Sequence, residues 1–248
     1  MNGPDLEAQI AAAQAYETLL VPALFGQWAP KVADAANLET GQRVLDVACG
    51  TGILAREASR RTGSTGYVAG LDPGGGMLAV AKALAPSVDW REGTAESLPF
   101  ADDVFDAVFS QFGLMFMDRE KAIPEMLRVL KPQGRLVAAV WDAVDNMPAY
   151  AAEIALLAHR AGARTADALR APFVLGEPGL LVDAFEAAGA SSVTIRHPQG
   201  HGALSQHPGD DRSGSERLAS GAGSAAHRAG DRSHPRERGS SVLPVPHR

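Results

Sequence analysis

The chain has 248 residues, of which 46% are hydrophobic, and a formal net charge of −6. A chain of this length buries a large core, and one catalytic domain with additions is the simplest expectation. The acidic balance offers no basic surface to a phosphate backbone, so we expect a small-molecule partner rather than a nucleic acid. Cys49 is the only cysteine, which excludes an intramolecular disulfide and a cysteine-based metal site and agrees with a reducing compartment.

The first residues of the chain contain neither a basic segment nor the apolar stretch that follows it in secretion signals. No apolar run approaches the roughly 20 residues that a membrane-spanning helix needs. We therefore expect a cytoplasmic protein that is not inserted in a membrane.

Residues 6–38 are rich in Ala, Leu, Gln and Glu, and they predict two or three helices interrupted at Pro22 and Pro30. From Arg43 onward, apolar strand-like segments alternate with helix-like segments. This alternation indicates an α/β fold with a doubly wound, mainly parallel sheet and helices on both faces. The expected strands are residues 44–48, 66–72, 88–92, 105–111 and 134–141, and the expected helices between them are residues 52–61, 76–84 and 118–130.

The alternation weakens after the fifth expected strand. Residues 149–161 and 180–188 predict helices, with a loop through Pro172 and Pro178 between them. Residues 192–196, Ser-Val-Thr-Ile-Arg, predict a sixth strand. We therefore expect a helical insertion followed by one more strand in this part of the chain.

The composition changes abruptly after Pro198, where Arg, Gly, Ser, His and Pro replace most large apolar residues. Such a segment cannot bury enough apolar surface to offset its ordering entropy, so we predict disorder for residues 199–248. Coding sequence read out of frame would produce this change, and a natural low-complexity tail is the alternative. The chain then divides into N-terminal helices (1–42), a sheet core (43–142), an insertion with the sixth strand (143–198) and this tail.

Gly50 and Gly52 lie where a strand is expected to end and a helix to begin, and glycine there lets a ligand approach the backbone closely. The stretch Gly50-Thr-Gly-Ile-Leu-Ala55 also satisfies the dinucleotide-binding pattern, and Asp72 lies about twenty residues further on, where a ribose-binding acid belongs. These residues alone leave open a nicotinamide dinucleotide site, a site for another cofactor, and a tight turn without a ligand.

Asp46 is an acid within an otherwise apolar strand. A buried carboxylate needs a partner, which the ammonium group of an amino-acid-like ligand would supply, whereas a pyrophosphate beside it would be repelled. Backbone amides could also satisfy Asp46 without any ligand. Gln111 ends the fourth expected strand and places a polar side chain at the carboxyl edge of the sheet, where folds of this kind bind their ligands.

Four segments of the chain carry a family resemblance, in a fixed order along the sequence. They are Val44-Leu-Asp-Val-Ala-Cys-Gly-Thr-Gly52, Gly70-Leu-Asp-Pro73 with Met77-Leu78 behind it, Gly93-Thr-Ala-Glu-Ser-Leu-Pro-Phe100, and Leu127-Arg-Val-Leu-Lys-Pro-Gln-Gly134. Together they resemble the class I S-adenosylmethionine-dependent methyltransferases, which have a Rossmann-like fold, and in particular the ubiquinone/menaquinone-biosynthesis type (methyltransferase type 11/25). The resemblance extends over about residues 10–198.

The resemblance implies S-adenosyl-L-methionine as the cofactor. A carboxylate has acceptor sites only, which suits the role implied for Asp72 of taking hydrogen bonds from both ribose hydroxyls. The residues implied to bind the cofactor are Asp46, Ala48, Gly50 and Gly52 around its methionine part, Asp72 at the ribose, Met77 on the adenine, Thr94, Ala95 and Glu96 at the adenine edge, and Gln111 at the sheet edge.

Two departures and one uncertain element accompany this assignment. Many relatives have Asp where this chain has Thr94, which puts an adenine amino contact there in doubt. The run Pro73-Gly-Gly-Gly76 is richer in glycine than usual and should loosen its loop. Phe25 and Trp28 would form a lid over the cofactor, as aromatic residues do in some relatives, or would simply pack on the sheet.

The activity implied by the resemblance is methyl transfer to a small molecule, EC 2.1.1.-. Displacement at a sulfonium methyl mainly needs a positioned acceptor and exclusion of water, and the sequence identifies no catalytic residue, with His159 and His197 as weak candidates for a base. Complete relatives have a further helix and strand, so we expect the sheet to lack its last strand. The alternatives are a truncated homologue that binds S-adenosylmethionine without catalysis, and an NAD(P)-dependent oxidoreductase.

Overall fold

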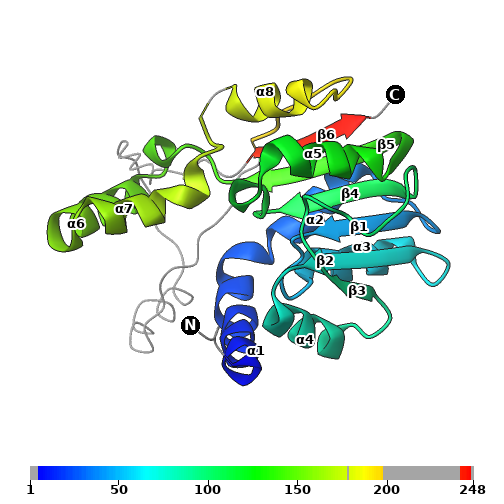
Figure 1. Cartoon of the computed structure of the whole chain (residues 1–248), viewed down its shortest axis with the longest axis horizontal. Coiled ribbons are helices and arrows are strands. Elements are labelled where there is room, and N and C mark those ends of the chain that lie inside the picture. Colours follow the sequence, from blue (N-terminus) through cyan, green and yellow to red (C-terminus); the bar gives the residue numbers. More distant parts are fainter. Residues whose placement is uncertain (1–4, 178, 198–240, 247–248) are drawn as a thin grey trace, which may run out of the picture.

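The computed structural model describes residues 5–177, 179–197 and 241–246, and its centre is a twisted six-stranded sheet in the order β3-β2-β1-β4-β5-β6 (Figure 1). The first five strands run parallel to their neighbours, whereas β6 runs antiparallel to β5. The prediction of a doubly wound α/β sheet is confirmed. The strands are β1 (Arg43–Val47), β2 (Tyr67–Asp72), β3 (Asp89–Glu92), β4 (Phe105–Gln111), β5 (Leu130–Val140) and β6 (Ser241–Pro246).

Three predictions about the C-terminal part are wrong. Residues 192–196 form no strand and contribute only one isolated bridge residue, Arg196. The place beside β5 belongs instead to β6, which pairs with residues 135–140 of β5, so the sheet does have a last strand and residues 241–246 are not disordered. Pro244 and Pro246 are tolerated because β6 is an edge strand. The other residues of the predicted disordered tail, 199–240 and 247–248, lie outside the described residues.

The helices between the strands lie where the sequence predicts them, and Figure 1 shows α5 on the near face of the sheet and α3 on the far face. Continuous burial of the central strands explains this covering, because Val44, Leu45 and Val47 of β1 are all fully buried. The helices are α3 (Ile53–Thr62), α4 (Gly75–Leu84) and α5 (Arg119–Arg128), with the short η2 (Leu114–Phe116) ahead of α5.

The N-terminal helices are α1 (Leu6–Ala15), the π-helix η1 (Tyr16–Phe25) and α2 (Trp28–Ala36). Their number agrees with the prediction, but neither proline interrupts a helix. Pro22 lies inside η1. Pro30 lies in the first turn of α2, where backbone N–H groups have no partner within the helix, so a proline is tolerated there. The break falls at residues 26–27 instead.

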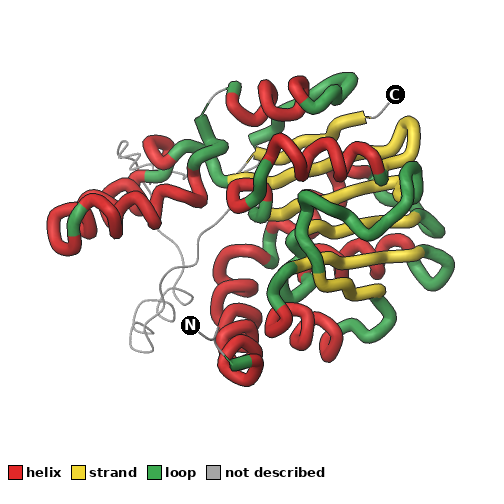
Figure 2. Tube along the Cα trace, in the orientation of Figure 1, coloured by secondary structure: helices red, strands yellow, loops and turns green. Residues whose placement is uncertain are grey.

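Residues 144–173 form a helical projection beside the sheet (Figure 2), whereas the later helix α8 (Leu180–Ala187) packs on the main core through Leu181 and Phe185. The small separate core of the projection contains Met147, Ile154, Ala166 and Phe173. The two predicted helices are present, and the expected loop between them contains one more helix. The elements are η3 (Val144–Asn146), α6 (Pro148–Ala161), α7 (Ala163–Arg170), η4 (Ala171–Phe173) and α8 (Leu180–Ala187).

Candidate cofactor site

The loop after β1 is built from backbone conformations that favour glycine. Gly50 and Gly52 have φ values of 55° and 83°, and Ala48 adopts φ 57° although it carries a side chain. A Cβ placed on Gly50 would meet nothing within 4 Å, whereas a Cβ on Gly52 would overlap the Trp90 ring. Gly50 therefore leaves space for a ligand against the backbone, and Gly52 makes room for the indole of β3.

Asp72, the last residue of β2, connects this loop to the next one. Its Oδ2 accepts a hydrogen bond from the Gly50 N–H at 2.9 Å, and its Oδ1 accepts one from the Gly74 N–H at 2.8 Å. Burial raises the pKa of Asp72, and the two amide donors oppose that rise. Each carboxylate oxygen retains acceptor capacity, which two neighbouring hydroxyls of a ligand can use.

Asp46 is 1% exposed and lies beneath the loop. The Ala55 N–H donates a hydrogen bond to its Oδ2 at 3.0 Å, so the carboxyl has the backbone partner that the ligand-free interpretation expected. Burial raises the pKa of Asp46 to about 8, and the nearby charge of Asp72 adds to the rise. A cation close to this carboxyl would favour its ionised form.

A cavity of about 280 Å³, here called the loop cavity, lies in front of these groups. Two buried side-chain oxygens in its lining have no hydrogen-bond partner, Thr51 Oγ1 and Gln111 Oε1. Such atoms are costly to bury, and a polar ligand would satisfy them. The lining residues are Tyr16, Phe25, Asp46, Ala48, Cys49, Gly50, Thr51, Ile53, Leu54, Gln111, Phe112 and Phe116.

A second cavity of about 630 Å³, the helix cavity, lies between α1, η1 and the start of α4. Its walls are almost entirely apolar, and they include the predicted adenine contact Met77. A Cβ on Gly76 would overlap the backbone of Gln9, so this glycine lets α1 cross α4 closely and does more than loosen the loop. The lining residues are Gln9, Ala12, Ala13, Ala15, Tyr16, Leu19, Leu20, Gly74, Gly76 and Met77.

The three residues predicted at the adenine edge line neither cavity. Thr94 is exposed, and Ala95 is buried in the main core. Glu96 accepts a hydrogen bond from the Asp118 N–H at 2.9 Å, at the start of α5. The structure thus brings Asp46, Ala48, Gly50 and Gln111 together in the loop cavity, joins Asp72 to them, and places Met77 and the adenine-edge residues apart.

The aromatic residues of the N-terminal helices have different surroundings. Phe25 lines the loop cavity, as a lid would, and stacks on Tyr16 with ring centroids 5.2 Å apart. Trp28 is buried and packs edge-on against Phe112, which is ordinary packing. The lining residues that the sequence reasoning missed are Tyr16, Cys49, Thr51, Ile53, Leu54, Phe112 and Phe116. For Cys49, Thr51, Ile53 and Leu54, a position in or next to the glycine loop could have indicated this location.

The candidate bases are remote from this chemistry. His159 and His197 are both exposed, and neither lines the two cavities. Within the described ranges, no group of three or more His, Cys, Asp or Glu side chains could hold a metal ion. No described helix is both long and apolar enough to cross a bilayer.

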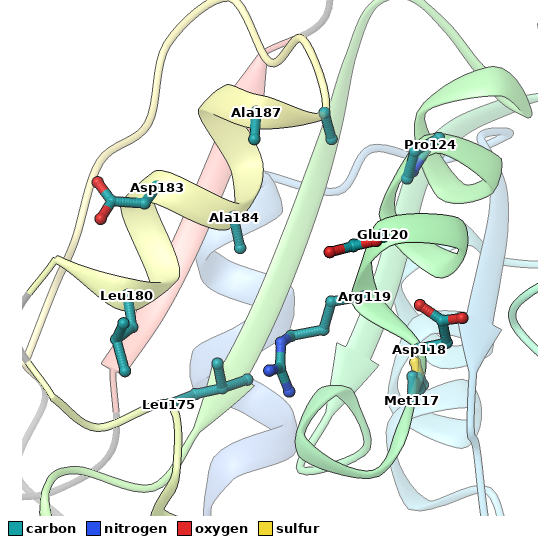
Figure 3. A pocket seen from close by; sticks show the side chains of 11 residues that line it. Met117, Asp118, Arg119, Glu120, Pro124, Leu175, Leu180, Asp183, Ala184 and Ala187 are labelled. Atoms are coloured by element: carbon teal, nitrogen blue, oxygen red, sulfur yellow. The ribbon is translucent and has the colours of Figure 1, made fainter.

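A third cavity of about 560 Å³ lies between α5 and α8, and none of the predicted site residues lines it (Figure 3). Figure 3 shows the guanidinium of Arg119 directed toward Leu175. Acidic side chains lie around the same cavity, and the carboxylate of Asp118 forms an ion pair with Lys121 at 2.7 Å. The polar lining therefore carries charges of both signs.

Comparison with known proteins gives a family match whose residues include the glycine loop after β1. Residues 45–138 match the family described as a methyltransferase domain. The chain is 47% identical over 115 residues to demethylmenaquinone methyltransferase of Renibacterium salmoninarum, covering 46% of this chain and 47% of that protein. It is 43% identical over 126 residues to the ubiquinone/menaquinone biosynthesis C-methyltransferase UbiE of Pseudomonas fluorescens, covering 48% and 49%. The chain thus spans about half the length of these relatives.

Among solved structures, the fold is similar to that of Haemonchus contortus phosphoethanolamine N-methyltransferase 2 in complex with S-adenosyl-L-methionine. The TM-score is 0.57 at 20% identity, with 76% of this chain and 43% of that chain covered. The fold, the glycine loop and the matched segment agree with one another. Residues 45–138 of this chain therefore match a methyltransferase domain, and the curated relatives that align with the chain are demethylmenaquinone and UbiE-type methyltransferases.

Proposed function

We propose that this chain binds S-adenosylmethionine at the loop cavity and transfers its methyl group to a small molecule. The observation that carries the proposal is the pair of buried side-chain oxygens without partners, Thr51 Oγ1 and Gln111 Oε1, on residues that line the loop cavity together with Gly50. A methionine-like group with both donors and acceptors fits these atoms. An apolar ligand would leave them unsatisfied.

The chain's own residues divide the binding task. Asp46, Gln111 and the backbone of residues 48–52 would hold the methionine part, and Asp72 would accept the ribose hydroxyls. Met77 would contact the adenine from the helix cavity. Thr94, Ala95 and Glu96 keep their proposed places at the adenine edge, which requires the base to extend beyond both cavities.

When bound, the cofactor supplies an electrophilic methyl group on a positively charged sulfur. The chain's task is to orient the acceptor toward that methyl and to exclude water. Phe25 and Phe112 form apolar walls around the loop cavity, and Phe116, 69% exposed, lies at its border. The described structure presents no side chain positioned as a general base, so the proton released by the acceptor passes to solvent in this proposal.

The acceptor proposed for this site is a planar hydroquinone-type ring. The names of the two relatives, a demethylmenaquinone methyltransferase and a C-methyltransferase of quinone biosynthesis, support this class. The aromatic walls support it independently, because Phe112 stacks on Trp141 with centroids 4.4 Å apart next to Phe25. In the reaction, a carbon–methyl bond forms, the sulfur–methyl bond breaks, and the ring carbon loses a proton.

Two measurements test the proposal. Calorimetric titration with S-adenosylmethionine and S-adenosylhomocysteine should show one site, and mass spectrometry should show a methylated product with the hydroquinone of demethylmenaquinone. Binding without transfer to this or other acceptors would identify the catalytically incompetent homologue. A melting-temperature increase with NAD(P) and none with S-adenosylmethionine would identify the oxidoreductase. A cytoplasmic location stays a prediction.

A further inference from the structure

Tyr16 has a place that no other described residue shares, because its side chain lines both the loop cavity and the helix cavity. Tyr16 therefore borders both cavities. Asp46 and Gly50 lie on the loop-cavity side, and Gly74 and Met77 lie on the helix-cavity side. A ligand that extends from the glycine loop to Met77 would have to pass this ring.

The π-helical winding of η1 explains why Tyr16 faces the site together with Phe25. In an α-helix, residues nine apart lie about two and a half turns apart and point to opposite sides. With i→i+5 hydrogen bonds a turn takes about 4.4 residues, so the same spacing is about two turns and both side chains point the same way. The stacked rings, 5.2 Å apart and inclined by 20°, agree with this geometry.

Sequence features maintain this winding. The Gly26 N–H donates to the Val21 carbonyl at 2.6 Å, an i→i+5 bond, and Pro22 inside η1 has no N–H to give to an α-helical bond. A π-helical segment is uncommon and is frequently found at functional sites. The winding thus aims two rings into the loop cavity that an α-helix would separate.

Both ends of η1 are tied to the cofactor loop and the sheet edge. Next to Tyr16, Glu17 forms an ion pair with Arg56 at 2.6 Å, and the same guanidinium donates to the Thr51 carbonyl at 2.7 Å. At the other end, the amide of Gln111 donates to the Phe25 carbonyl at 3.3 Å. The phenol is therefore fixed relative to the groups that would hold the ligand.

The chemistry of the Tyr16 hydroxyl suits a hydrogen-bond donor. Burial raises its pKa, and the negative charges of Glu17, Asp72 and Asp46 raise it further, so the phenol stays protonated. No described residue forms a hydrogen bond with this hydroxyl. A ligand with ribose or carboxylate oxygens would provide the missing acceptor.

We propose that Tyr16 is a positioning residue whose hydroxyl donates a hydrogen bond to the bound nucleoside cofactor between the loop cavity and the helix cavity. This inference rests on the proposed function. The ring of Tyr16, stacked on Phe25, covers one side of the loop cavity. Its hydroxyl favours ligands that carry an oxygen acceptor between the two cavities. The π-winding of η1 holds both features in place.

The test is calorimetric titration of the whole chain with S-adenosylhomocysteine, which measures binding without turnover. Tyr16→Phe keeps the ring and its stacking but removes the hydroxyl, and we expect the Kd to rise roughly 3- to 10-fold, as for the loss of one hydrogen bond. Tyr16→Ala also removes the stacked ring and should weaken binding further. The matched control is Tyr67→Phe. Tyr67 lies at the start of β2, lines neither cavity, and donates a hydrogen bond from its hydroxyl to Asp89. The Kd of this variant should stay within about 2-fold of that of the unaltered chain.

A kinetic measurement separates positioning from a structural role. Tyr16→Phe should raise the KM for S-adenosylmethionine and leave the melting temperature unchanged, because the ring still packs. An unchanged Kd in Tyr16→Phe, with normal binding to the unaltered chain, overturns the inference and leaves the proposed function standing. Absence of binding to the unaltered chain overturns both.

Discussion

Two regions of the molecule differ in the size of the hydrophobic core that stabilises them. They are the sheet region, residues 43–140, and the projection formed by α6, α7 and η4. The sheet region shares one large core that includes Leu45, Phe109 and Leu136, all fully buried. The projection depends on a cluster of four buried residues. The strands and the glycine loop proposed to hold the cofactor are therefore supported by the large core, whereas the projection is supported by a much smaller one.

The largest expected effect compares a glycine from each region. Gly52→Ala puts a Cβ on a residue with φ 83° and into the Trp90 ring, and should lower the free energy of unfolding by about 2–5 kcal/mol. Gly162, between α6 and α7, has φ 87° and ψ 166°, a region nearly restricted to glycine, but open space around it, so Gly162→Ala should cost about 1–3 kcal/mol from backbone strain alone. Urea unfolding of both variants measures the difference. Equal losses would show that backbone strain alone, without the Trp90 contact, decides the cost.

A second comparison separates the two ends of the sheet. Asp72→Ala should weaken binding of S-adenosylmethionine by about 1–3 kcal/mol, measured by calorimetry, because it removes the acceptor proposed for the ribose. At the opposite edge of the sheet, Asp106 accepts a hydrogen bond from the Arg43 N–H at 2.8 Å. Asp106→Ala therefore removes a similar bond to the backbone, at a place without access to the site, and serves as the control. Its Kd should match that of the unaltered chain. A similar loss in both variants would mean that Asp72 acts through stability alone.

A third, smaller effect follows from the buried carboxyl of Asp46. Its pKa is raised from 3.8 to about 8, so between these values the folded chain holds a proton that the unfolded chain has lost. The contribution of this group to the free energy of unfolding therefore falls as the pH rises from about 4 to 8. Asp46→Asn keeps an oxygen for the Ala55 N–H and removes the titration, which should flatten the profile and make the variant more stable than the unaltered chain near pH 7.5. Urea unfolding at several pH values gives the two profiles, and parallel profiles would contradict the assignment.

The sheet region was also the part that the sequence predicted well. The strands β1, β2, β4 and β5 are mainly apolar runs, and β1, β2 and β4 are each followed by a loop and a helix, so residues close together in the sequence determine these structures. The glycine loop and Asp72 were predictable for the same reason, since a strand end and a helix start bring them together.

What the sequence did not reveal depends on distant partners. The strand β6 forms against residues 135–140, a hundred residues earlier in the chain, in a segment whose composition indicates disorder. Tyr16 was not recognised because α-helical spacing puts it opposite Phe25, and only the π-helical winding brings the two rings together. The role of Glu96 at the start of α5 depends on Asp118, a contact that no local pattern signals.

The smallest effect on the cofactor is expected from the projection. Phe173→Ala removes a ring that packs on Tyr150 at 5.3 Å and on Trp141 at 6.4 Å between centroids. Among the described aromatic contacts, Phe173 is linked to the loop cavity through the Trp141 ring, which stacks on Phe112. We therefore expect the Kd for S-adenosylhomocysteine to change by less than about 2-fold, while the KM for a ring-bearing acceptor rises several-fold. Calorimetry and initial rates measure the two quantities. A loss of cofactor affinity as large as that of Asp72→Ala would show that the projection and the sheet region form one energetic unit.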